Sequence, residues 1–196
     1  MRIGIYSGSF DPIHIGHAMV ANYCAQWGGL DEVWLMVSRL NPLKEGSRPE
    51  ADLHRFRMVK LVAEECHGVK ASDFELNLPL PSYTYVTLCK LREQYPEHEF
   101  KLIIGSDNWA NIGRWRNAHK IIREFGILIY PRPGFELPQD PPPGVELISS
   151  GPTAFVSSTF VRNAVAEGAN INFFVPLVVA DYIREHNLYI NKEEKK

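Results

Sequence analysis

Short apolar runs alternate along this chain with longer stretches in which apolar residues recur at helical spacing. The runs typical of strands are Arg2–Tyr6, Glu32–Val37, Val69–Ser72, Phe100–Ile104, Phe125–Tyr130 and Val145–Ile148. The stretches typical of helices are Ile15–Trp27, Ala51–Cys66, Tyr83–Tyr95, Ala118–Glu124, Ser158–Ala166 and Pro176–His186. This alternation favours an α/β protein with a doubly wound, mostly parallel sheet that has helices on both faces.

The ends of the predicted strands indicate where a ligand would bind. Ligands of doubly wound sheets bind beyond the carboxyl ends of the strands, at the point where the strand order reverses. Gly8, Ser38, Gly105 and Pro131 each follow a predicted strand. We therefore expect one site to collect residues from several strand ends. The prolines and glycines of residues 131–144 are typical of an irregular surface loop.

Composition and charge narrow the class of protein. The chain has 196 residues, of which 45% are hydrophobic and 22% charged, and we expect a single domain over residues 1–190 with a frayed charged tail at 191–196. A net charge of −2 argues against a broad nucleic-acid surface. Three cysteines without a C-x-x-C spacing, and no visible signal peptide or membrane span, favour a cytoplasmic protein. The sequence is compatible with both a monomer and a homo-oligomer.

The sequence GSFDPIHIGH, from Gly8 to His17, joins a predicted strand to a predicted helix. Backbone N–H groups at a helix start have no intrahelical partner, and the helix dipole adds positive charge there, so an anion is favoured. His14 and His17 lie one turn apart, which lets both rings face one cluster of oxygens. The segment therefore predicts a phosphate site, and the alternative is a surface turn with two solvated histidines.

A second helix start offers similar groups. Ser157, Ser158 and Thr159 precede an apolar helical pattern and are typical of an N-cap. Arg162 follows one turn later on the same face and can hold phosphate oxygens with two N–H groups. The alternative is an ordinary cap with a solvated arginine.

Three weaker signals lie between these segments. Lys44, in a loop with proline and glycine, could close over a polyphosphate or simply be solvated. Asp107 follows a predicted strand and could bind ribose hydroxyls. Trp115 could stack on a planar ring or belong to the core. Residues 82–84 could start a helix that holds a small carboxylate or amide, or be a cap without a ligand.

Together these segments resemble the nucleotidylyltransferase superfamily that carries an H-x-G-H motif, and within it the bacterial nicotinate-nucleotide adenylyltransferases. The resemblance runs from Gly8 to about Arg162 and includes the second motif, S-S-T-x-x-R, at Ser157–Arg162. The segments at 82–84, 105–107 and Trp115 match the subfamily, whereas Leu43 stands where the family usually has histidine before the loop lysine.

The resemblance implies adenylyl transfer from ATP to nicotinate mononucleotide, which gives nicotinate adenine dinucleotide and pyrophosphate in NAD biosynthesis. The catalytic residues that it implies are His14, His17, Lys44 and Arg162. The implied ATP-binding residues are His14, His17 and Arg162 with Gly8, Ser9, Phe10, Gly16, Ser157, Ser158 and Thr159. The implied residues for nicotinate mononucleotide are Ser9, Lys44, Tyr83, Thr84, Asp107, Trp115 and Arg132. Mg²⁺ is expected to accompany ATP, without a metal site formed by protein side chains.

Other functions remain possible from the sequence. The same chemistry could use nicotinamide mononucleotide or phosphopantetheine as acceptor, or transfer a cytidylyl group. The H-x-G-H string also occurs in class I aminoacyl-tRNA synthetases, but this chain lacks their lysine-rich second motif and their length. A non-catalytic nucleotide sensor would keep the fold without the reaction.

Overall fold

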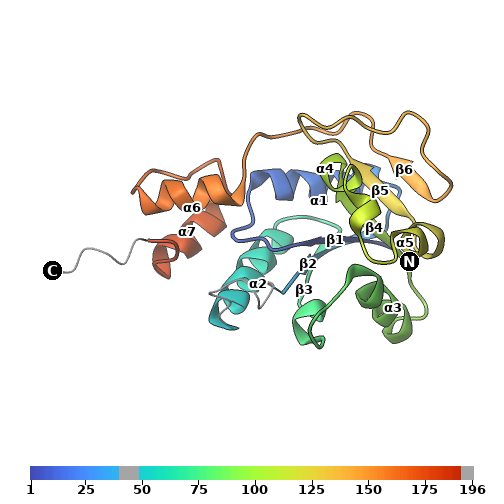
Figure 1. Ribbon diagram of the computed structural model, residues 1–196. Coiled ribbons are helices and arrows are strands. Elements are labelled where there is room, and N and C mark those ends of the chain that lie inside the picture. Colours follow the sequence, from blue (N-terminus) through green and yellow to red (C-terminus); the bar gives the residue numbers. More distant parts are fainter. Residues whose placement is uncertain (40–48, 191–196) are drawn as a thin grey trace.

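The structure is a computed structural model that describes residues 1–39 and 49–190, and its centre is a six-stranded sheet (Figure 1). The strands are β1 (Arg2–Gly8), β2 (Glu32–Val37), β3 (Val69–Ser72), β4 (Glu99–Gly105), β5 (Ile127–Tyr130) and β6 (Val145–Leu147). Their order is β3-β2-β1-β4-β5-β6, and every neighbouring pair is parallel. The predicted doubly wound sheet is confirmed, and its order reverses between β1 and β4.

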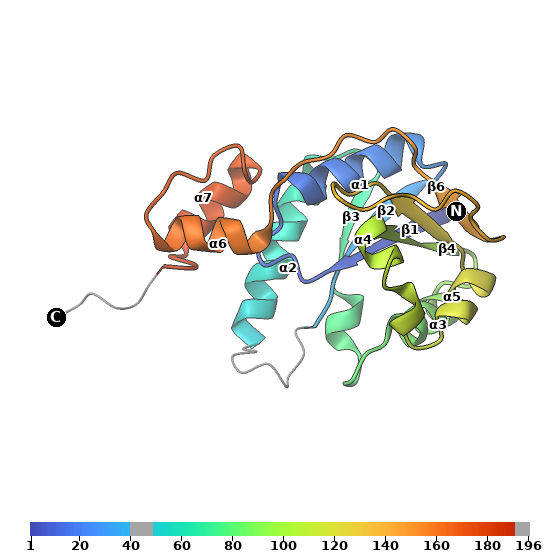
Figure 2. The same ribbon diagram turned by 45° about the horizontal axis from the view of Figure 1, so that its top comes forward.

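The helices cover both faces of the sheet. They are α1 (Ile15–Trp27), α2 (Pro49–Glu64), α3 (Thr84–Gln94), α4 (Ser106–Trp109), α5 (Ala118–Glu124), α6 (Ser158–Ala166) and α7 (Leu177–Glu185). Two short 3₁₀ helices, η1 (Phe74–Asn77) and η2 (Ile112–Arg114), complete the described elements. Figure 2 shows α1 on one side of the sheet and α3 and α5 on the other. None of the helices within these residues has the length and hydropathy that a membrane crossing requires.

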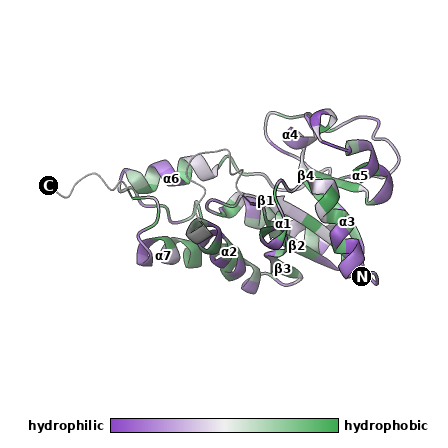
Figure 3. Ribbon diagram, turned by 60° about the horizontal axis from the view of Figure 1, so that its bottom comes forward, coloured by the Kyte–Doolittle hydropathy of each residue, from purple (hydrophilic) through white to green (hydrophobic). Residues whose placement is uncertain are grey.

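The side chains of each strand point alternately to the two faces of the sheet, so the buried residues form two cores. In β4, Leu102 and Ile104 pack with α3 and α5, whereas Ile103 belongs to the core beneath α1 and α2. Successive side chains of a strand point to opposite faces, so both faces of this strand need apolar residues. Hydrophobic and hydrophilic residues alternate along the helices, as Figure 3 shows for α2 and α3.

Helices α6 and α7 lie beside α2 at one end of the molecule (Figure 1). Val161 and Ala164 of α6 and Val179 and Ile183 of α7 join the core beneath α1 and α2. This packing brings the start of α6 close to the start of α1, although the two are far apart in the sequence (Figure 2).

The structure differs from the sequence-based elements mainly near strand ends. Residues 106–109, for which no element was predicted, form α4, and η1 and η2 were not predicted either. Phe125 was predicted in a strand but closes α5, because Gly126 takes a positive φ of 76° there and β5 begins one residue later. Lys44 and the tail at 191–196 lie outside the described residues.

Candidate active site

The loop from β1 to α1 brings the two predicted histidines together. His14 is the N-cap of α1, and its ring stacks on that of His17, with centroids 3.7 Å apart and an interplanar angle of 22°. The backbone N–H of His14 donates to Nδ1 of His17 at 3.3 Å. In a neutral His17 ring this leaves Nε2 to carry the proton, so the ring has an N–H free to donate.

Close packing holds the histidine rings in place. Phe10, which is 1% exposed, has a left-handed φ of 46° and turns its ring edge-on to His17, with centroids 5.0 Å apart. A Cβ on Gly16 would lie 3.1 Å from Cε1 of His14 and 3.4 Å from the Val156 side chain. A larger residue at Gly16 would therefore press on the His14 ring. The buried Phe10 side chain supports His17 and leaves only its backbone for a ligand.

Burial keeps both imidazoles neutral at pH 7. Burial, together with the charge of Arg132, lowers the pKa of His14 to about 4. The pKa of His17 is also well below its ordinary value, because of burial, the neighbouring His14 and Arg132. Each neutral ring keeps one N–H, which can donate to a phosphate oxygen.

The start of α6 is joined to the same loop by hydrogen bonds. The hydroxyl of Ser158 donates to the carbonyl of Pro12 at 2.9 Å. Arg162 donates to the carbonyl of Asp11 at 2.7 Å and to the hydroxyl of Thr159 at 3.3 Å. The structure thus brings the two sequence motifs together, with Arg162 beside the loop that carries the histidines.

A cavity of about 550 Å³ opens between these two helix starts. Its lining includes His14, His17, Asp107, Arg132, Ser157 and Ser158. Asp107, in α4 directly after β4, and Arg132, after β5, face each other with Oδ1 and Nε 3.8 Å apart. A Cβ on Gly105 would lie 2.2 Å from Oδ1 of Asp107, so only glycine leaves room for this pair.

The predicted ring-binding residues line a separate cavity of about 290 Å³. Tyr83, Thr84 and Trp115 line it together with Ser82 at the start of α3. The guanidinium of Arg116 lies 4.7 Å from the centre of the Tyr83 ring. Trp115 is half-buried and packs against the core under α3 and α5, while its stacking on a planar ring stays a prediction.

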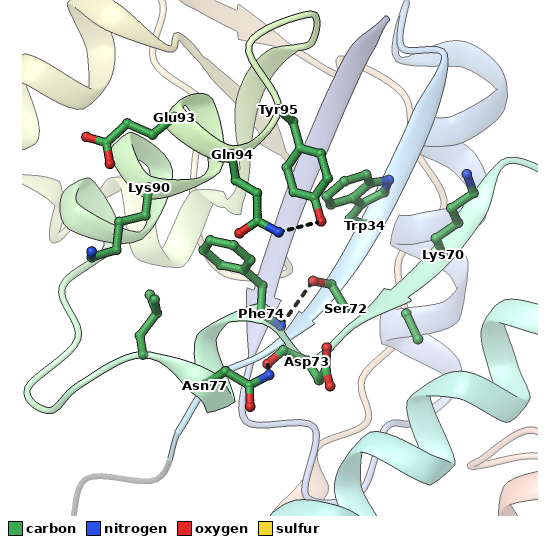
Figure 4. A pocket seen from close by; sticks show the side chains of 12 residues that line it. Trp34, Lys70, Ser72, Asp73, Phe74, Asn77, Lys90, Glu93, Gln94 and Tyr95 are labelled. Carbon is green, nitrogen blue, oxygen red and sulfur yellow. Dashed lines mark hydrogen bonds between the residues drawn. The ribbon is translucent and has the colours of Figure 1, made fainter.

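A larger cavity of about 680 Å³ contains none of the predicted site residues (Figure 4). Trp34, Phe74 and Tyr95 lie around it, next to Lys70 and Lys90 (Figure 4). It lies beside β3, away from both helix starts that hold the two motifs.

The sequence patterns did not predict two residues that support the site, Arg55 and Tyr189. Arg55 of α2 is 1% exposed and donates to the carbonyls of Ser9 and Ser38, at the ends of β1 and β2. The Tyr189 hydroxyl donates to the Asp11 carboxylate at 2.7 Å. Each was hidden because its partner is distant in the chain, so no local pattern marks it.

The described residues contain no group of three or more histidine, cysteine, aspartate or glutamate side chains that could hold a metal ion. Asp107 is the one carboxylate among the described residues lining the histidine cavity, and its Oδ1 is buried without a hydrogen bond. A divalent cation that prefers oxygen ligands could meet this carboxylate while keeping phosphate and water as its other ligands.

Comparisons with known proteins identify the family of this chain. Residues 5–164 match the cytidylyltransferase-like family. The probable nicotinate-nucleotide adenylyltransferase of Bacteroides thetaiotaomicron is 49% identical over 186 residues, covering 95% of this chain and 92% of the relative. The corresponding protein of Flavobacterium johnsoniae is 42% identical over 196 residues, covering 96% of this chain and 99% of the relative.

A solved structure extends the likeness to three dimensions. The nicotinic acid mononucleotide adenylyltransferase of Plasmodium falciparum, complexed with NaAD, matches with a TM-score of 0.82 and 26% identity. The match covers 98% of this chain and 99% of that one. The chain therefore belongs to the cytidylyltransferase-like family and, within it, to the nicotinate-nucleotide adenylyltransferases.

Proposed function

We propose that this protein transfers the adenylyl group of ATP to nicotinate mononucleotide, giving nicotinate adenine dinucleotide and pyrophosphate in NAD biosynthesis. The observation that carries the proposal is the junction of two helix starts. The stacked neutral histidines at the start of α1 meet Arg162 of α6, which donates to the carbonyl of Asp11 in the preceding loop. Family membership supports the choice of reaction.

The reaction is an attack of the mononucleotide phosphate on the α-phosphorus of ATP, with pyrophosphate leaving in line. A phosphate monoester is ionised at neutral pH, with a second pKa of about 6, so the attack needs no general base. The protein then has to align the two phosphates and stabilise the charge that develops between them. His17 would donate its Nε2 proton to the α-phosphate, and His14 would bind a neighbouring phosphate oxygen.

The leaving pyrophosphate would be held from the α6 side. Ser158, Thr159 and Arg162 present hydroxyl and guanidinium donors there, and Ser157 caps the helix. Gly8, Ser9 and Phe10 would offer the backbone of the first loop, and Gly16 would seat the adenine. Lys44, outside the described residues, would add a cation to the same phosphates.

The acceptor would bind across the second cavity. Trp115 would stack on the pyridine ring, while Tyr83 and Thr84, at the start of α3, offer N–H groups and a hydroxyl to its carboxylate. Asp107 would bind ribose hydroxyls, and Arg132, which lines the histidine cavity, would neutralise the phosphate.

Mg²⁺ would enter with the triphosphate and neutralise part of its charge. We further propose that residues 1–190 act as a single nucleotidylyltransferase domain. The cysteines of the described residues, Cys24, Cys66 and Cys89, are unpaired, which supports a reducing compartment, and the proposed location is the cytoplasm.

The test is turnover with a panel of acceptors at equal concentration. Purified protein is given ATP and Mg²⁺ with nicotinate mononucleotide, nicotinamide mononucleotide or phosphopantetheine, and pyrophosphate and the adenylylated product are both measured. We expect nicotinate mononucleotide to give the highest kcat/KM. Faster turnover of phosphopantetheine would refute the stacking role of Trp115, and ATP binding without pyrophosphate release from any acceptor would favour a sensor.

A further inference from the structure

Glu75 is a buried carboxylate with no assigned role in the proposed reaction. It lies in η1 and is 8% exposed. Its neighbours Phe74 and Asn77 line the cavity of Figure 4, whereas Glu75 is absent from that lining. The short helix therefore presents two side chains to the cavity and turns this carboxylate into the protein.

The carboxylate is hydrogen-bonded by three separate segments. Ser82, just before α3, donates its hydroxyl to Oε1 at 3.0 Å. Hydrogen bonding with the side chain of Ser7 in β1 and with the backbone of Arg39 after β2 acts to lower the pKa of Glu75, so both groups lie next to the carboxylate. One side chain thus joins the ends of β1 and β2 to the segment that begins α3.

Two of these segments lead directly into the site. Ser7 precedes Gly8 and the histidine loop, and Ser82 lines the cavity formed with Tyr83, Thr84 and Trp115. The distance between these segments sets where an acceptor in the second cavity lies relative to the histidines. A shift of even 1 Å between reacting groups can cost a large factor in rate.

A positive charge lies close to this carboxylate. Burial raises the pKa of Glu75, while its hydrogen bonds and the charge of Arg55 act in the opposite direction. Arg55 itself donates to the carbonyls of Ser9 and Ser38, so both buried charges act on the same strand ends. Arg55 makes its ion pair with Asp52, at 2.6 Å, and acts on Glu75 through its charge. A buried carboxylate lowers stability unless its hydrogen bonds compensate, so stability alone is a weak reason for Glu75 at this place.

We propose that Glu75 is a positioning residue that sets the acceptor-binding segment at Ser82–Thr84 against the phosphate loop that follows β1. The inference rests on the proposed function, because it assigns the second cavity to the mononucleotide. Glu75 acts through Ser82 and Ser7 and does not itself touch substrate.

The test compares kinetic constants for the two substrates separately. In Glu75→Gln a side-chain NH₂ group replaces one carboxylate oxygen, and this group cannot accept a hydrogen bond from the donors around Glu75. The KM for nicotinate mononucleotide should therefore rise about tenfold. KM for ATP and kcat should change by less than about twofold, because the histidine loop keeps its own packing. Ser82→Ala removes one donor and should raise the same KM about threefold, with little further rise in the double variant.

Glu32→Gln is the matched control. Glu32 begins β2, accepts from Trp34 Nε1 at 3.0 Å and pairs with Lys70 at 2.7 Å, at the end of the sheet away from the site. Its variant should lose a similar amount of stability and keep both KM values. Equal rises of KM for both substrates in Glu75→Gln, or an unchanged KM for the acceptor in both Glu75→Gln and Ser82→Ala, would overturn the proposal. A wild-type protein without dinucleotide formation would instead refute the proposed function, and this inference with it.

Discussion

The starts of α1 and α6 meet at one site but are built in different ways. The α1 start is buried: His14 is 3% exposed, and Phe10 and the close approach at Gly16 fix both rings. The α6 start is more open, with Phe160 46% exposed, and it is held by hydrogen bonds from Ser158 and Arg162 to the α1 loop. Packing positions one set of donors, and polar contacts position the other.

This difference predicts a division of labour. Buried neutral rings cannot move far, so they suit the atom whose charge changes during the reaction. Arg162 retains charge and some exposure, so it suits a leaving group that must enter and depart. Substitutions on the α1 side should therefore affect kcat most, and those on the α6 side should affect ATP binding.

The largest expected effect is that of His17→Ala. Loss of an oriented donor to a developing charge costs about 3 kcal/mol, so kcat should fall at least about 100-fold with little loss of stability. Thermal unfolding and steady-state kinetics of the purified variant provide the measurement. A fall of less than tenfold in folded protein would count against the role of His17 at the α-phosphate.

Acid should destabilise the protein because His14, at the start of α1, is buried in its neutral form. The pKa of His14 is about 4 in the folded protein and ordinarily 6.5, so between these values the unfolded chain binds the proton more readily. Stability is therefore fully present above pH 6.5 and falls as pH drops toward 4, by as much as about 3 kcal/mol from this group.

Denaturant unfolding of the wild type and of His14→Asn at several pH values would measure this effect. The variant should lose less stability on acidification, while His67→Asn, at an exposed position, should behave like the wild type. Identical pH dependence in all three proteins would contradict a buried neutral His14.

Much of the fold and both motifs could be predicted because they depend on local patterns. Alternating apolar runs indicated the parallel sheet, and glycine, histidine and hydroxyl spacing indicated the two helix starts. The sequence could not show that Trp115 and the histidines line different cavities, since that depends on how α3 and η2 pack. Nor could it show Arg55 or Glu75, because charged residues are usually solvated and the groups that these two contact, at Ser38 and Ser82, belong to other segments of the chain.

Arg162→Lys should have an intermediate effect on the α6 side. Lysine keeps the charge but loses the planar fork that now reaches both Asp11 and Thr159. We expect kcat/KM for ATP to fall about tenfold, mainly through KM. Steady-state kinetics at varied ATP concentration would measure this fall. A fall confined to kcat would mean that Arg162 acts on the reaction step, as the histidines do, and not on ATP binding.

The smallest expected effect is that of Ser157→Ala, which removes the side-chain cap of α6. The Ser157 hydroxyl accepts from the N–H of Phe160 at 3.1 Å, and losing such a cap costs about 1 kcal/mol of stability. KM for ATP should rise by less than about threefold, because Ser158 and Arg162 still tie α6 to the first loop. Ser150→Ala, at an exposed position before the helix, is the control and should leave both quantities unchanged. A loss of activity as large as that of His17→Ala would mean that α6 needs its cap to place Arg162, and the open helix start would then be as finely positioned as the buried one.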